Sequence, residues 1–291
     1  MSDGERVSDH STDAFGSADT EDRSTQSTGQ WGAWMRQASG FTYRTLRDVS
    51  RSWTVLAIAI GLPPVMYLLV TATREFDPTT KGLFAGGIAV LGAMIASLTV
   101  FGSQLAVDLE TDRFVAYRSM GVYPSADFAG RVAAGVVVAA LALCFGLGVS
   151  VIDGVPVDIS GALPVAVSIA AFLGLSVVFM AVAVPVVVAA NNEQYAQFAL
   201  SLIAVFGFML TGYNGMLMEA AILDGSTSGL LPNVLATRTM TAQLITTERV
   251  ASAGSAGGSS RLAPLFVYSL GAAAFGVLLT RWQLYNRGVR R

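Results

Sequence analysis

The sequence has few of the side chains that soluble enzymes use for chemistry. Its 291 residues include one cysteine, one histidine and one lysine, and only 13% are charged, against about 25% in an ordinary soluble domain. The single cysteine, Cys144, excludes an intramolecular disulfide and a cysteine-based zinc site. The single histidine, His10, lies in a polar stretch with no scaffold for a catalytic triad. We therefore expect no enzyme activity, no catalytic residue, no metal site and no cofactor site on this chain.

The one lysine also excludes ATP hydrolysis by a Walker-type phosphate-binding loop. Such a loop has glycine directly before its lysine, whereas Thr80 precedes Lys81 here. If ATP drives this protein, ATP and its Mg²⁺ are bound by a separate chain. The net charge of −2 also gives no basic surface of the kind that binds nucleic acids, so a nucleic-acid partner is excluded.

Apolar residues are abundant, at 53% of the chain, and the mean hydropathy is +0.57. A helix needs about 20 predominantly apolar residues to cross a bilayer. Six segments meet this length without one charged residue inside them: 53–73, 83–107, 132–152, 162–190, 194–218 and 262–280. The sequence therefore predicts an all-α polytopic membrane protein with six transmembrane helices in the lipid bilayer of the cell membrane.

Two different segments precede the first span. Residues 1–30 are acidic, rich in Ser, Thr and Gly and poor in apolar side chains, which predicts a disordered tail. Residues 31–52 alternate at helical spacing between apolar residues, such as Trp31 and Phe41, and arginines, such as Arg36 and Arg44. This pattern is typical of an amphipathic helix lying in the membrane interface. Residues 31–291 then form one six-span domain.

The arginines predict the orientation. With the N-terminus in the cytoplasm, and leaving aside Arg6 and Arg23 of the tail, eleven basic residues lie on the cytoplasmic side and five outside. Because positive residues concentrate in cytoplasmic loops, we expect both termini in the cytoplasm and residues 225–260 outside. No ionisable side chain lies in the middle of a span, which argues against an ion-coupled carrier or an intramembrane protease.

The first cytoplasmic loop, residues 108–131, is longer than a simple connector. Asp108, Glu110 and Asp112 predict the start of a short helix, because acidic side chains stabilise a helix N-terminus. Gly121 and Pro124 then predict its end. The loop therefore carries a short helix with aromatic and cationic side chains.

The order of these parts resembles the permease subunit of an ABC-2 type ABC exporter. The resemblance rests on the basic helix, two spans, an acidic loop that runs into Gly121-Val-Tyr-Pro124-Ser125, four more spans, and a Leu231-Pro232 element in the outer segment 229–240. The acidic polar regions, with seventeen arginines to one lysine, also resemble a haloarchaeal proteome in composition.

The resemblance implies partners and sites. An ABC ATPase subunit would bind ATP and Mg²⁺, and a second permease copy or a paralogue would complete the exporter. The helix that couples to the ATPase would contain Arg113, Phe114, Tyr117 and Arg118. The translocation path would be lined by spans two and five, with Gln104, Phe208, Thr211, Tyr213 and Asn214.

Two other functions stay open on the sequence. A polytopic scaffold or assembly subunit without transport activity has the same composition and spans. A lipid-handling enzyme would need polar groups at an interface, where only Asn191, Asn192 and Glu193 gather. ATPase stimulation by this chain would separate transport from scaffolding.

Overall fold

The protein is an all-helical bundle in which six helices are long and apolar enough to cross a membrane. The computed structural model describes residues 18–159, 161–190, 192–217, 221–245 and 258–285. Among these residues the one β-type pairing is the isolated bridge between Val157 and Ile245. The prediction of an all-α protein with six helices that are long and apolar enough to span a membrane is confirmed.

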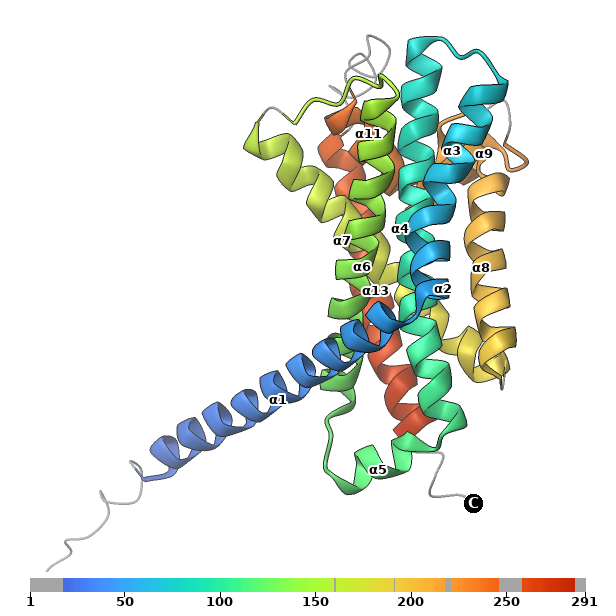
Figure 1. The fold of residues 1–291 in the computed structure, drawn as a ribbon. Helices are drawn as coiled ribbons and strands as arrows, with labels where there is room; N and C mark the ends of the chain where they lie inside the picture. The colour runs from blue at the N-terminus through green and yellow to red at the C-terminus, as the bar shows by residue number, and fades with distance from the viewer. Residues whose placement is uncertain (1–17, 160, 191, 218–220, 246–257, 286–291) are drawn as a thin grey trace, which may run out of the picture.

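Figure 1 shows the order of the helices along the chain. They are α1 (Ala18–Arg51), α2 (Trp53–Leu56), η1 (Ala57–Gly61), α3 (Leu62–Thr73), α4 (Pro78–Glu110), α5 (Arg113–Ser119), α6 (Pro124–Ile152), α7 (Ala162–Ala190), α8 (Glu193–Leu210), α9 (Gly212–Gly215), α10 (Gly225–Ser228), α11 (Pro232–Leu244), α13 (Gly258–Leu279) and η3 (Thr280–Tyr285). The two ends of the bundle are named here after α5 and α11, which lie at opposite ends.

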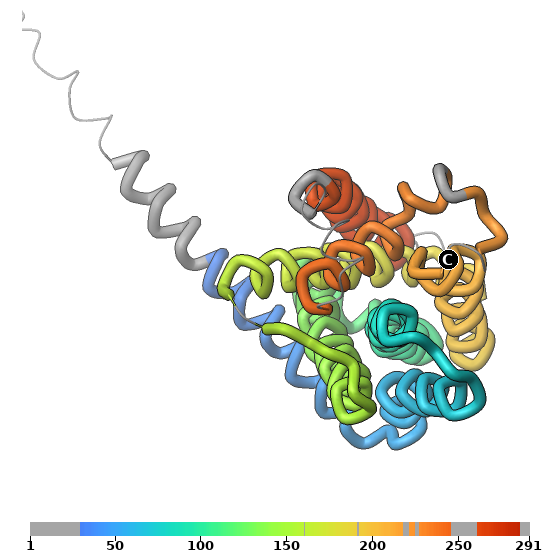
Figure 2. Tube along the Cα trace, turned by 90° about the horizontal axis from the view of Figure 1, so that it is seen from above, coloured from blue at the N-terminus to red at the C-terminus, as the bar shows by residue number. Residues whose placement is uncertain are grey.

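The second span, α4, is the centre of the bundle. It packs against α3, α6, α7, α8 and α11, and Figure 2 shows it surrounded by the other helices. Its most apolar 18-residue stretch is 94% buried. Small residues permit this packing: a Cβ on Gly92 would lie 3.3 Å from Pro63, and a Cβ on Gly102 would lie 2.1 Å from Leu200. Close approach of small residues is a general way for membrane helices to associate.

The first span is continuous but not regular. A π-helical turn, η1, connects α2 to α3, and Pro63 and Pro64 follow in the first turn of α3. Because proline has no N–H to donate to the preceding turn, the hydrogen-bond register shifts before the two prolines. The span therefore runs without interruption from Trp53 to Thr73.

Several boundaries differ from the prediction, among them the start of the third span, where α6 begins at Pro124 and not at residue 132. The fifth span ends at Leu210 instead of residue 218, because Gly212, Tyr213 and Asn214 take left-handed backbone angles. The sixth continues past residue 280 as the π-helix η3. The helix α4 extends to Glu110, so Asp108 lies in its last turn and not at the start of the next helix.

The helix α1 leaves the bundle at an angle (Figure 1). It packs against α6 near the first span and begins at Ala18, ahead of the predicted residue 31. Residues 1–17 of the predicted disordered tail lie outside the described residues. Trp31, Met35 and Tyr43 are among its exposed side chains, which is consistent with the interfacial location that the sequence predicts.

The orientation of the bundle can be tested by cysteine labelling. In a Cys144→Ser background, a membrane-impermeant maleimide applied from outside should label Glu75→Cys, in the exposed turn between α3 and α4, and spare Ser119→Cys on α5. The arginine excess on the α5 side is the physical reason. The opposite labelling pattern would reverse the predicted orientation, and labelling of both sites after permeabilisation is the control for reactivity.

Candidate functional site

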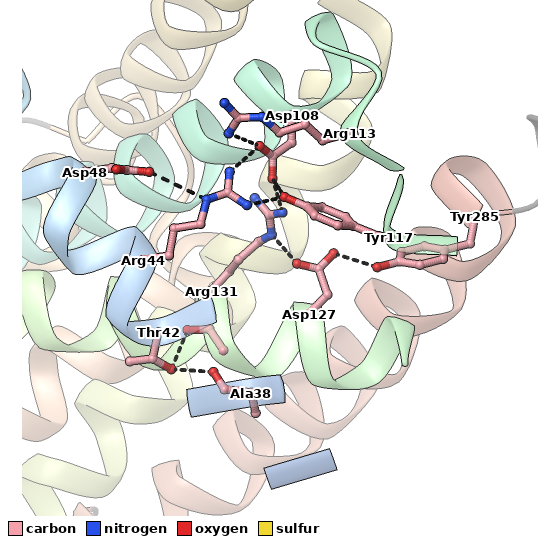
Figure 3. Close-up of polar contacts among 11 residues, drawn as sticks. Ala38, Thr42, Arg44, Asp48, Asp108, Arg113, Tyr117, Asp127, Arg131 and Tyr285 are labelled. Atoms are coloured by element: carbon pink, nitrogen blue, oxygen red, sulfur yellow. Dashed lines mark hydrogen bonds and ion pairs between the residues drawn. The ribbon is translucent and has the colours of Figure 1, made fainter. Parts of the chain in front are cut away.

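A buried group of ionic and polar side chains joins five elements at the α5 end (Figure 3). We call it the arginine–aspartate cluster. It contains Arg44 from α1, Asp108 from α4, Arg113 and Tyr117 from α5, Asp127 and Arg131 from α6, and Tyr285 from η3. The two carboxylates have no exposed surface, and Arg131 is only 2% exposed.

Asp108 is the centre of this cluster. Its Oδ1 accepts hydrogen bonds from Arg44 Nη2 at 2.5 Å and Arg113 Nη1 at 3.0 Å. Its Oδ2 accepts from Arg131 Nη2 at 2.5 Å and from the Tyr117 hydroxyl at 2.8 Å. A carboxylate has about four lone-pair sites, so these four donors satisfy its full capacity. One side chain on α4 thereby holds α1, α5 and α6.

Arg131 is the buried cation of the cluster. Its Nε donates to Asp127 Oδ1 at 2.6 Å, one turn earlier on α6, while Nη2 donates to Asp108. The rings of Phe41 and Phe114 lie 5.7 and 5.9 Å from its guanidinium carbon, within the range of cation–π attraction. A buried charge is tolerated only when it is paired and hydrogen-bonded, and Arg131 meets both conditions.

The rim of the cluster extends the same network. Arg44 donates to the Tyr117 hydroxyl, which in turn donates to Asp108. Burial raises the pKa of the Tyr117 hydroxyl, and the Asp108 charge adds to this effect against an opposing hydrogen bond from Arg44. Tyr117 therefore keeps the proton that it donates. The Arg44 Nε also lies 3.8 Å from Asp48, so three arginines face three carboxylates.

The structure places the four residues of the predicted coupling helix on α5. Phe114 and Tyr117 are buried at 5% and 7% exposure, and their rings pack edge to face at 5.6 Å. Arg113 binds Asp108, and Arg118 Nη1 donates to the backbone oxygen of Tyr285 at 3.1 Å. All four side chains thus contact other residues of the same chain. The exposed side of the helix carries other residues, among them Val115 and Met120 at 56% and 64%.

The predicted path-lining residues divide into two places. Phe208, Thr211, Tyr213 and Asn214 lie together at the α11 end, whereas Gln104 lies in the part of α4 nearer Asp108. The ring of Tyr213 packs against Phe208 at 5.1 Å. Within the single chain Phe208, Thr211 and Asn214 are buried, and Tyr213 is partly buried.

A hydrogen-bonded network of uncharged groups surrounds Thr211 and Asn214 at the α11 end. The Asn214 amide donates to the Gly87 oxygen of α4 at 3.1 Å, and the Asn233 amide of α11 donates to Asn214 Oδ1 at 2.9 Å and Thr211 Oγ1 at 3.1 Å. Asn214 has a φ of 59°, a left-handed angle that asparagine tolerates better than most residues. A Cβ on Gly87 would come within 2.6 Å of the Tyr213 oxygen, so glycine is required for this contact.

Sequence reasoning did not find the arginine–aspartate cluster. Asp127 and Arg131 are one helical turn apart at the start of an otherwise uncharged span, which is a visible local signal. Asp108 similarly ends an uncharged span. The contacts of Asp108 with Arg44 and Arg131 join residues far apart in the chain, and no local spacing encodes them.

Comparison with known proteins gives no family assignment. No protein-family model matches the chain, and no curated protein matches it. Its function is therefore argued from its own residues.

Removing the buried cation should destabilise the fold. Arg131→Met leaves the buried Asp127 without its cation and removes one of the four donors of Asp108, and breaking a buried ion pair in this way costs about 3–5 kcal/mol. Denaturant unfolding of the purified protein in detergent measures this loss. The exposed Arg74→Met is the control and should change stability little. A cost for Arg131→Met as small as that of Arg74→Met would show that the cluster does not hold the helices together.

The neutral network at the α11 end should contribute less to the free energy of unfolding than the arginine–aspartate cluster does. Asn233→Leu leaves the Asn214 and Thr211 oxygens without their donor, and an unsatisfied buried polar group costs about 1–3 kcal/mol. The same unfolding assay measures it. Thr237→Val is the matched control, because the Thr237 hydroxyl donates only within its own helix, to the Asn233 oxygen. Equal costs for the two variants would contradict a network that joins α11 to α9.

Proposed function

We propose that this chain is the membrane subunit of an ABC-2 type exporter, which couples ATP hydrolysis on a separate ATPase subunit to substrate movement across the cell membrane. One observation carries the proposal. A short helix outside the spans, α5, is tied by the arginine–aspartate cluster to α1, α4, α6 and η3. A displacement of α5 therefore acts on several helices at once.

The two sides of α5 suit this role. Its inner side is fixed by Arg113, Phe114 and Tyr117, which are held by a charged hydrogen bond and ring contacts. Its outer side presents the apolar side chains of Val115 and Met120. The cores of protein interfaces are depleted of charged residues and enriched in Met, so these two side chains suit a docking contact. We infer that the ATPase contacts this outer side.

The position of α1 supports the same proposal. Its exposed Trp31 and Met35 and its partly exposed arginines fit the membrane interface, and Arg44 joins it directly to Asp108 on α4. The helix thus connects the inner membrane surface to the central span. In the exporter, α1 would move with α5 when the ATPase closes on ATP.

The spans place limits on the transported path. Because Phe208, Asn214 and their neighbours are packed within one chain, a path lined by them requires the α11 end to open or a second permease copy to meet this chain. A homodimer or a heterodimer with a paralogue satisfies this requirement. The proposal places the protein in the cell membrane with both termini in the cytoplasm, as the arginines predict.

The docking surface on α5 can be tested with a double variant. Tagged full-length chain, purified from membranes of its own host, should carry a protein that hydrolyses ATP. The exchange of Val115 and Met120 for Asp should weaken this association, because each apolar anchor in an interface contributes up to about 2 kcal/mol. The measurement is ATP hydrolysis in the purified sample per amount of tagged chain.

The matched control exchanges two exposed apolar residues for Asp at the α11 end, Ile159 and Leu230, which are 69% and 64% exposed. This variant should keep the ATPase. Tyr117→Ala is a poor choice, since it removes a donor from Asp108 and perturbs the fold itself. Full ATPase association of the α5 variant would contradict the docking surface. Failure of the unchanged chain to carry any ATPase would favour the scaffold or assembly function over the exporter.

A further inference from the structure

An apolar groove lies between α7 and α13, in the half of the bundle toward the α11 end. Its volume is about 510 Å³, within the range of roughly 300–1,000 Å³ typical of ligand pockets. The lining residues are Ala170, Leu173, Gly174 and Val177 on α7 and Leu262, Ala263, Leu265, Phe266 and Ser269 on α13. The Ser269 hydroxyl donates to the Leu265 oxygen at 2.7 Å within its own helix, so the groove surface is almost entirely apolar.

The groove opens on the outside of the bundle. Only 11% of the most apolar stretch in the sixth span is buried, the lowest share among the six candidate spans of the described residues. Phe266 on the groove wall is 64% exposed. In a bilayer this side of α13 contacts acyl chains or another apolar helix, because no water is present there.

Positive charge gathers at the rim of the groove. Arg261 directly precedes Leu262 and Ala263, which line the groove. Arg238 lies on α11, which packs against both α7 and α13. Burial lowers the pKa of Arg238, and the nearby charge of Arg261 lowers it further. Arg238 Nε donates to the Gly215 oxygen at 3.2 Å, and an anion bound by Arg261 is attracted by both positive charges.

We propose that this site binds one anionic phospholipid from the leaflet at the α11 end. An acyl chain occupies the groove between α7 and α13, and the headgroup phosphate accepts hydrogen bonds from Arg261 at the rim. The site goes beyond the proposed export function and does not depend on it. The ligand class follows from the two parts together, since an apolar groove in the spans and a cation at headgroup depth match the two ends of one lipid.

Charge argues against a second copy of this chain in the groove. Closed dimers use the same surface patch on both subunits, so a dimer through this face would bring the Arg238 and Arg261 of both copies together. Like charges in a partly dehydrated interface repel each other. A lipid supplies the opposite charge instead.

Native mass spectrometry of the full-length chain tests the site. The protein is purified in detergent with added phosphatidylglycerol or phosphatidylcholine, and bound lipids are counted for each. We expect the unchanged chain to retain one phosphatidylglycerol in preference to phosphatidylcholine. Arg261→Gln should weaken phosphatidylglycerol retention roughly tenfold, because a charge-assisted hydrogen bond is lost, and leave phosphatidylcholine unchanged. Ala263→Trp, which fills the groove, should weaken retention of both lipids.

The matched controls are the same kinds of substitution at positions outside the groove. Arg74→Gln removes an exposed arginine elsewhere at the same end, and Val267→Trp adds a ring on the lipid-facing side of α13, where Val267 is 69% exposed. Both should retain phosphatidylglycerol as the unchanged chain does. Ala170→Leu narrows the groove from α7 and should repeat the effect of Ala263→Trp if that variant folds poorly.

Two results would overturn the site. Unchanged phosphatidylglycerol retention in Arg261→Gln would show that the rim arginine does not select the headgroup. A shift from dimer to monomer in Ala263→Trp, with lipid retention unchanged, would assign the groove to a second copy of the chain.

Discussion

The four hydrogen bonds to Asp108 determine how the parts of this protein meet. All four donors come from helices other than α4, so the carboxylate holds the entry helix, the loop helix and the third span in one geometry. Removing such a charge from water costs several kcal/mol, and only a full set of donors offsets it. The cluster therefore fixes the relative positions of the helices more than it adds to the free energy of unfolding. A buried carboxylate with only some of its donors would be less favourable than an apolar side chain in its place.

The cluster lies at the end of the spans, where some of its charged side chains can be exposed while others are buried. Arg44 and Arg113 keep part of their side chains exposed, at 31% and 44%, while Arg131 is buried between aromatic rings. The charges thus reach from the membrane edge into the protein without entering the middle of the bilayer. A helix docked through Val115 and Met120 would transmit force along bonds that are already formed, with no gap to close first.

The sequence predicted the spans well because their signal is local. Uncharged runs of about twenty residues define them, and all six are present. The charged residues next to these runs were misread, since Asp108 and Arg131 lie in helices that continue past the apolar stretch. The end of the fifth span was also not predicted. Gly212 and Asn214 are uncharged and fit the composition of a span. The contact of Asn214 with Gly87, which fixes the left-handed backbone of Asn214, is tertiary and has no local signal.

The two ends of the bundle differ in the free energy needed to separate their helices. At the α5 end, separation of the helices breaks charge-assisted hydrogen bonds to a buried carboxylate, at about 3–5 kcal/mol for a lost partner. At the α11 end, the contacts of Asn214 and Asn233 are between neutral groups, each worth about 0.5–1.5 kcal/mol net. The break between α8 and α9 already carries unusual backbone angles at Tyr213 and Asn214, and such positions can absorb a hinge motion. Within the proposed exporter, the α5 end therefore moves as a unit, and the conformational change of the path occurs at the α11 end.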